Sequence, residues 1–107
     1  MGYYADAHGS VHAKSREKAD AILWHIDRIG EWDKHDITQD GLDIYIDTSD
    51  YYHDDAYEEL MDALVAEDLA DSAEIECAGG VSEFWGFFLD KSNERGWVVK
   101  AGRVVYE

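Results

Sequence analysis

Histidine and cysteine are the residues of this chain with the widest chemical repertoire, and they number five and one. His8 and His12, together with Asp6, have the composition of a metal site if residues 3–13 fold back as a hairpin. Their spacing is not a zinc motif, and Cys77 as the sole cysteine excludes a thiolate cluster and an intrachain disulfide. We therefore expect neither a metal nor any other cofactor.

Signatures of enzyme active sites are absent from the sequence. It contains no glycine-rich phosphate loop, no G-x-S-x-G nucleophile elbow and no EF-hand loop. Cys77 is in strand phase with Ile75, which favours a buried structural thiol over a nucleophile. Carboxylate pairs such as Asp54 and Glu58 are too frequent to identify a general acid and base. We expect no enzymatic activity.

The outstanding feature is negative charge. The 107 residues carry a formal net charge of -16, whereas a magnitude of about 2–8 keeps a small domain soluble. Residues 35–90 contain no Lys or Arg and 17 of the 25 acidic residues. Self-repulsion of this size lowers stability, so the charge indicates a function beyond solubility. The alternatives are adaptation of a whole proteome to salt, and drift.

The first half of the chain predicts a strand, a helix and a second strand. Residues 3–13 read as a strand or a bent hairpin with a turn signal at His8-Gly9-Ser10. Ser15 is a good N-cap, and apolar residues then recur at helical spacing until Gly30 ends the helix. Residues 31–41 read as a polar connection. The next segment alternates strictly, with Leu42, Ile44 and Ile46 on one side and Asp43, Tyr45 and Asp47 on the other.

The second half predicts one more helix and a β-rich end. The helix spans about residues 54–69, and no cation is expected to offset Asp68 and Asp71 at its C-terminal end. Strands are predicted over residues 73–78 and 81–89, joined by a turn at Gly79-Gly80. A hairpin of residues 97–99 and 103–106 around Ala101-Gly102 closes the chain.

These elements predict a single α+β domain over residues 1–107. We expect a two-layer sandwich in ferredoxin-like β-α-β-α-β-β-β order, with two helices on one face of a mainly antiparallel sheet. No apolar run approaches the roughly 20 residues of a membrane span. The N-terminus lacks the basic and apolar regions of a signal peptide, so we expect a cytoplasmic protein.

The acidic residues of this segment are spaced at distances that suit a charged ligand of a basic groove. Acids on the 42–47 strand repeat at about 7–13 Å, and acids four apart on the second helix lie about 6 Å apart along its axis. Such a surface could occupy a basic groove that normally holds nucleic acid. Trp24, on the polar side of the first helix, is either an exposed anchor or packed beside Trp32. The candidate partner-binding residues are Trp24, Asp43, Tyr45, Asp47, Asp50, Asp54, Asp55, Glu58, Glu59 and Asp62.

In size, charge and the acidic segment 36–76, the chain resembles small acidic phage-encoded anti-defence proteins, including anti-CRISPR and anti-restriction nucleic-acid mimics. The resemblance implies an inhibitor that binds the basic surface of a host defence complex, as a monomer or homodimer, without binding nucleic acid or membrane. A second hypothesis is an acidic regulatory or housekeeping interaction domain without mimicry, which predicts acids dispersed over all faces. A small enzyme or metal-binding protein is the third.

Overall fold

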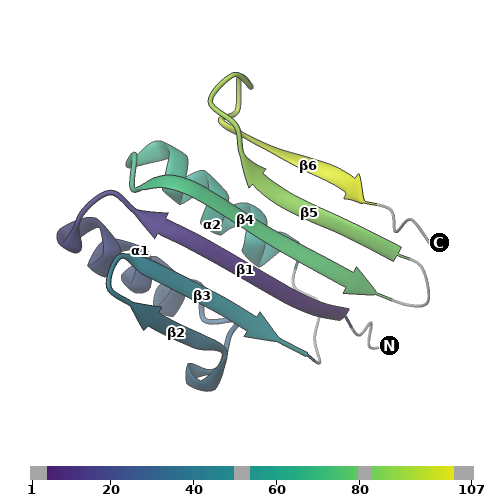
Figure 1. Cartoon of the computed structure of the whole chain (residues 1–107), viewed down its shortest axis with the longest axis horizontal. Helices are drawn as coiled ribbons and strands as arrows, with labels where there is room; N and C mark the ends of the chain where they lie inside the picture. The colour runs from purple at the N-terminus through teal and green to yellow at the C-terminus, as the bar shows by residue number, and fades with distance from the viewer. Residues whose placement is uncertain (1–4, 50–53, 80–82, 103–107) are drawn as a thin grey trace.

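The described part of the chain folds as a six-stranded antiparallel sheet with two α-helices on one side of it (Figure 1). The computed structural model describes residues 5–49, 54–79 and 83–102. The elements are β1 (Ala5–Ala13), α1 (Arg16–Ile29), the 3-10 helix η1 (Lys34–Asp36), β2 (Ile37–Asp40), β3 (Asp43–Thr48), α2 (Asp54–Ala66), β4 (Ala70–Gly79), β5 (Glu83–Leu89) and β6 (Trp97–Gly102). The strand order is β2-β3-β1-β4-β5-β6, and every neighbouring pair is antiparallel.

The predicted α+β class, with two helices and an antiparallel sheet, is confirmed. The predicted element order is wrong by one strand, because residues 37–40 of the expected connection form β2. This edge strand has no apolar alternation, since only Ile37 is partly buried while the next three residues are exposed. Main-chain pairing with β3 holds β2 in the sheet, and amino-acid composition does not reveal such pairing.

Of the strand and the bent hairpin predicted for residues 3–13, the strand is correct, whereas the turn predicted at Ala101-Gly102 is wrong. Residues 5–13 form one uninterrupted strand at the centre of the sheet, so Gly9 lies within a strand rather than at the bend of a hairpin. Ala101 and Gly102 pair with Trp85 and Phe84 as the end of β6. The strand expected over residues 103–106 and the turn residue Gly80 lie outside the described residues.

Helix α1 begins and ends where its capping residues predict. The Ser15 hydroxyl accepts a hydrogen bond from the Lys18 amide at 3.2 Å, and Gly30 adopts a left-handed conformation with φ 74°. The amide of Gly30 then donates to the carbonyl of Ile26. The buried side of the helix presents Ala19, Ile22, His25 and Ile26 to the sheet and to α2.

Alternation along β1, β3 and the part of β4 after Ser72 separates a buried side from an exposed one. The inward residues form the core beneath the helices, and they include Ala7, Val11, Ile44, Ile46, Ile75 and Cys77. Cys77 is buried, as its strand phase predicted. Neither helix in the described part of the chain has the length and apolarity needed to cross a membrane.

Asp68 at the end of α2 has cationic partners, contrary to the sequence-based expectation. Lys14 Nζ donates to Asp68 Oδ1 at 2.6 Å, and Lys18 Nζ donates to the Asp68 carbonyl at 2.9 Å. Both lysines are more than 45 positions away along the chain, so only the fold brings them to this helix end. The hydrogen bond and charge of Lys14 lower the pKa of Asp68.

Replacing Lys14 with glutamine is expected to raise the pKa of Asp68 toward that of an ordinary aspartate. The lowered pKa stabilises the fold above the pKa of the unfolded chain, and this contribution disappears as the pH falls through the folded value. An NMR titration of the carboxyl carbon measures the change. Lys34→Gln, on η1, is the matched control and should leave Asp68 unaffected. An unchanged titration in Lys14→Gln would contradict the pairing.

Candidate functional site: the open face of the sheet

No described helix or strand covers the side of the sheet opposite the helices, and Figure 1 shows this side toward the viewer with both helices behind. We call it the open face. Its polar and charged residues are those that alternate with the core along five strands. They are Asp6, His8, Ser10 and His12 on β1, Thr38 and Asp40 on β2, Asp43, Tyr45 and Asp47 on β3, Ser72, Glu74 and Glu76 on β4, and Lys100 on β6.

Two histidines of β1 pair with aspartates of β3 at the centre of the open face. His8 Nδ1 lies 2.8 Å from Asp47 Oδ1, and His12 Nδ1 lies 2.6 Å from Asp43 Oδ1. The register places these residues directly opposite each other. The hydrogen bond with Asp43 raises the pKa of His12, and the charges of Asp43 and Asp71 act in the same direction, while desolvation opposes them.

The other neighbour of β1 contributes two further carboxylates. The register places Glu76 opposite His8, and Glu74 opposite Ser10. These four side chains, with the backbone of Gly9, line a shallow open hollow of about 230 Å³. On β5, Gly86 pairs with Glu76 and has no side chain. On β6, Lys100 pairs with Gly86, and its Nζ lies 5.3 Å from the centre of the Phe88 ring.

The open face is negatively charged with little internal compensation. Its six carboxylates are Asp6, Asp40, Asp43, Asp47, Glu74 and Glu76. Within the described ranges, none of the six forms an ion pair with a lysine or arginine. Strands β3 and β4 flank β1, so their acids lie in two rows about 10 Å apart.

Acids on the helical side are in a different situation, because several are paired with cations of the same molecule. Asp62 accepts from Trp97 Nε1 at 2.8 Å and lies 3.5 Å from Arg95 Nε. Asp68 is paired with Lys14. These contacts join α2 to the segments packed against it, so they have a structural role.

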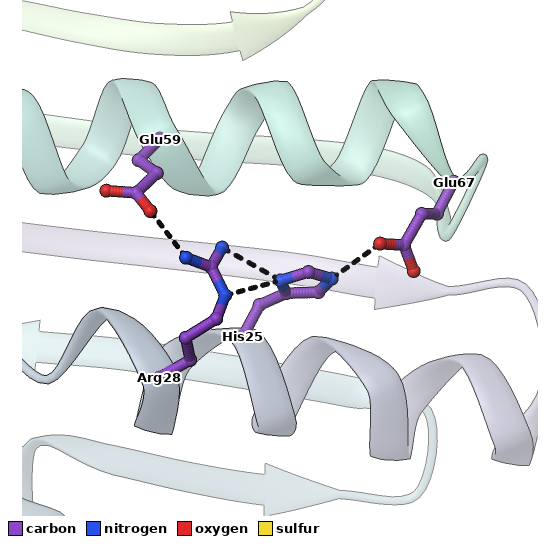
Figure 2. A network of polar contacts seen from close by, with 4 residues as sticks. All are labelled: His25, Arg28, Glu59 and Glu67. Atoms are coloured by element: carbon purple, nitrogen blue, oxygen red, sulfur yellow. Dashed lines mark hydrogen bonds and ion pairs between the residues drawn. The ribbon is translucent and has the colours of Figure 1, made fainter.

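A four-residue network joins α1 to α2 in the same way (Figure 2). Arg28 donates to Glu59 Oε2 at 2.6 Å and, through Nη2, lies 3.0 Å from His25 Nδ1. His25 Nε2 lies 2.9 Å from Glu67 Oε2. Because Nδ1 faces a guanidinium that can only donate, the neutral imidazole carries its hydrogen on Nε2 and donates to Glu67.

The structure divides the predicted partner-binding residues between two sides of the molecule. Asp43, Tyr45 and Asp47 lie on the open face, at strand positions facing away from the core. Helix α2, on the other side of the sheet, carries Asp55, Glu58, Glu59 and Asp62, and it begins at Asp54. Asp50 lies outside the described residues.

Trp24 also lies on the helical side, away from the open face. Its side chain is 60% exposed, so it is not packed beside Trp32, which instead contacts Tyr57 at a ring distance of 5.5 Å. The rings of Trp24 and His25 form a T-shaped contact with their centres 5.0 Å apart, and the guanidinium carbon of Arg28 lies 5.7 Å from the centre of the Trp24 ring. The exposed reading of this residue is therefore correct.

The set predicted from the sequence lacked the β1 and β4 part of the open face. Alternation already placed Glu74 and Glu76 outward, but only strand order shows that they flank His8 opposite the β3 acids. The convergence of His8 and His12 that a hairpin would have given does not occur, because four positions of one strand separate them by about 13 Å. In the described ranges, no group of three or more His, Cys, Asp or Glu side chains could hold a metal ion.

Comparison with known proteins identifies no relative of this chain. No family model matches it, and no curated protein or solved structure is significantly similar.

Proposed function

We propose that this protein is an acidic binding protein that uses the open face to occupy a basic, nucleic-acid-binding surface of a host defence complex in the cytoplasm. The observation that carries the proposal is the difference between the two sides. Of the acids on the helical side, Glu59, Asp62 and Asp68 are paired with lysine or arginine of the same molecule although others are not, whereas none of the six carboxylates of the open face has a lysine or arginine partner among the described residues. Charges held uncompensated at a cost in stability are available to a partner.

The spacing of these charges supports mimicry of nucleic acid. Two rows of carboxylates about 10 Å apart, with charges about 7–13 Å apart along each strand, match the scale of phosphates bordering a groove about 6–12 Å wide. Tyr45, which is 40% exposed between Asp43 and Asp47, supplies an aromatic surface within one row. The proposed activity is inhibition by occupancy, and it requires neither catalysis nor a cofactor.

The direct test is displacement of a labelled duplex from candidate partners, namely restriction enzymes and CRISPR surveillance complexes. The open-face variant combines Asp43→Asn, Asp47→Asn, Glu74→Gln and Glu76→Gln. We expect it to bind at least about tenfold more weakly than the native chain, with a shallower dependence of affinity on salt. Fluorescence anisotropy at several salt concentrations measures both effects.

The helical side provides a matched control with the same change in charge. Asp20→Asn, Asp27→Asn, Asp55→Asn and Glu58→Gln remove four carboxylates that form no ion pair in the described structure. This variant should bind within about twofold of the native chain. Equal losses in both variants would show that net charge alone drives binding, and an affinity insensitive to salt would contradict the proposal.

An acidic interaction domain without mimicry is the second candidate, because acids do occupy both sides of the molecule. Under this function a partner would bind without competing with duplex DNA, so the displacement assay separates the two.

We also infer that β1 to β4 with the two helices form a ferredoxin-like β-α-β-β-α-β unit, which β5 and β6 extend. This fold occurs with many functions and favours neither candidate.

A further inference from the structure

Of the two open-face histidines, His8 stands between carboxylates of both neighbouring strands. His8 contacts Asp47 of β3 and is opposite Glu76 of β4, with Glu74 and Tyr45 in the next row. On its own strand, Asp6 and Ser10 precede and follow it. All of these neighbours are acids or neutral groups.

His12 has a similar setting one row beyond Ser10. It contacts Asp43 of β3 and is opposite Ser72 of β4, and the charge of Asp71 also acts on it. Asp40 of β2 is opposite Asp43 and continues the acidic row. A proton taken up by either imidazole therefore neutralises charge at the centre of the open face.

We infer that protonation of His8 and His12 controls the affinity of the open face for its basic partner. The inference rests on the proposed function, because it concerns the same surface. When the imidazoles are neutral, Asp43 and Asp47 offer their full charge to a partner cation. When the imidazoles are charged, they hold these two carboxylates as internal ion pairs and repel the arriving cation.

The direction of the pH dependence follows from this competition. Asp43 favours the charged form of His12 in the free protein, whereas a guanidinium bound nearby disfavours that form. The complex therefore holds fewer protons than the free protein. Affinity should rise with pH across the range in which histidine titrates, and binding at intermediate pH should release protons.

A fluorescein-labelled nona-arginine peptide is a suitable probe, because arginine does not titrate near neutrality. We expect the native chain to bind it roughly tenfold more weakly at pH 6 than at pH 8. A His8→Gln/His12→Gln variant should lose most of the dependence of its affinity on pH. His35→Gln, which removes an exposed histidine of η1, is the control and should keep the native dependence.

Calorimetry in two buffers of different ionisation enthalpy gives an independent readout, since protons released on binding change the observed heat. The native chain should release protons at pH 6.5 and the double variant should release far fewer. Equal affinities of the native chain at pH 6 and pH 8, or a dependence retained by the double variant, would overturn the inference and leave the proposed function standing. Failure of the peptide to bind at any pH would overturn both.

Discussion

Replacing Trp97 with alanine is expected to lower the free energy of unfolding by about 3–5 kcal/mol. Trp97 is 2% exposed and lies on the inward side of β6, where its ring centre is 6.0 Å from that of Phe87. Its Nε1 donates to Asp62 of α2, and the guanidinium carbon of Arg95 lies 3.9 Å from the ring centre. The substitution therefore removes a core side chain and two contacts that join β6, α2 and the loop before β6.

Urea unfolding followed by circular dichroism measures this loss as a change in midpoint at constant slope. Val99→Ala, two residues along the same strand, is the matched control, because Val99 is half exposed and should contribute less than about 1 kcal/mol. Trp97→Phe should fall between the two, since it keeps an aromatic ring but loses the hydrogen bond to Asp62. A loss in Trp97→Ala no larger than that in Val99→Ala would contradict the packing described for β6.

Replacing Gly9 with alanine should destabilise the protein by about 1–3 kcal/mol, although alanine normally suits a strand better than glycine. An added Cβ would lie 2.8 Å from Ile75 Cγ1 and 3.3 Å from the Glu74 carbonyl oxygen. Ile75 is fully buried and cannot move aside without disturbing the core. Gly9 is therefore required by close packing between β1 and β4.

A double-mutant cycle with Ile75→Ala tests this explanation. Ile75→Ala alone should cost about 2–5 kcal/mol because it opens a cavity. In that background the Gly9→Ala substitution should become neutral or stabilising, since the atom it would clash with is gone. Ser10→Ala, which points to the open face, should change stability by less than about 0.5 kcal/mol. Additive losses at positions 9 and 75 would exclude a steric cause.

Local sequence signals were sufficient to predict the helix that has its own capping residues and the strands that have an alternating apolar pattern. Ser15 and Gly30 define α1, and the alternation around Ile44 and Ile75 identifies the buried side of β3 and β4. They failed at β2, where main-chain pairing replaces an apolar pattern, and at Gly9, where the neighbouring strand makes the glycine necessary. Both failures depend on contacts between segments far apart in the chain.

The candidate site was predictable residue by residue but not as a surface. The outward positions of Asp43 and Asp47 follow from their spacing, whereas the histidine partner of each depends on β1 lying beside β3. Charge density alone also gave a wrong prediction for α2, whose acids were expected to be available to a partner. Its acids were the densest in the sequence, yet Glu59 and Asp62 are paired with arginines from α1 and from the loop before β6.

The alternation of β1, β3 and β4 has a consequence for how this protein can change over evolutionary time. Each exposed residue, such as Glu74, has a buried neighbour, such as Ile75, that alone maintains the packing. Substitutions on the open face therefore leave the core intact and can accumulate one at a time. If the partner changes during evolution, the exposed residues of this surface can be substituted repeatedly while the buried residues at alternate positions of the same strands are retained.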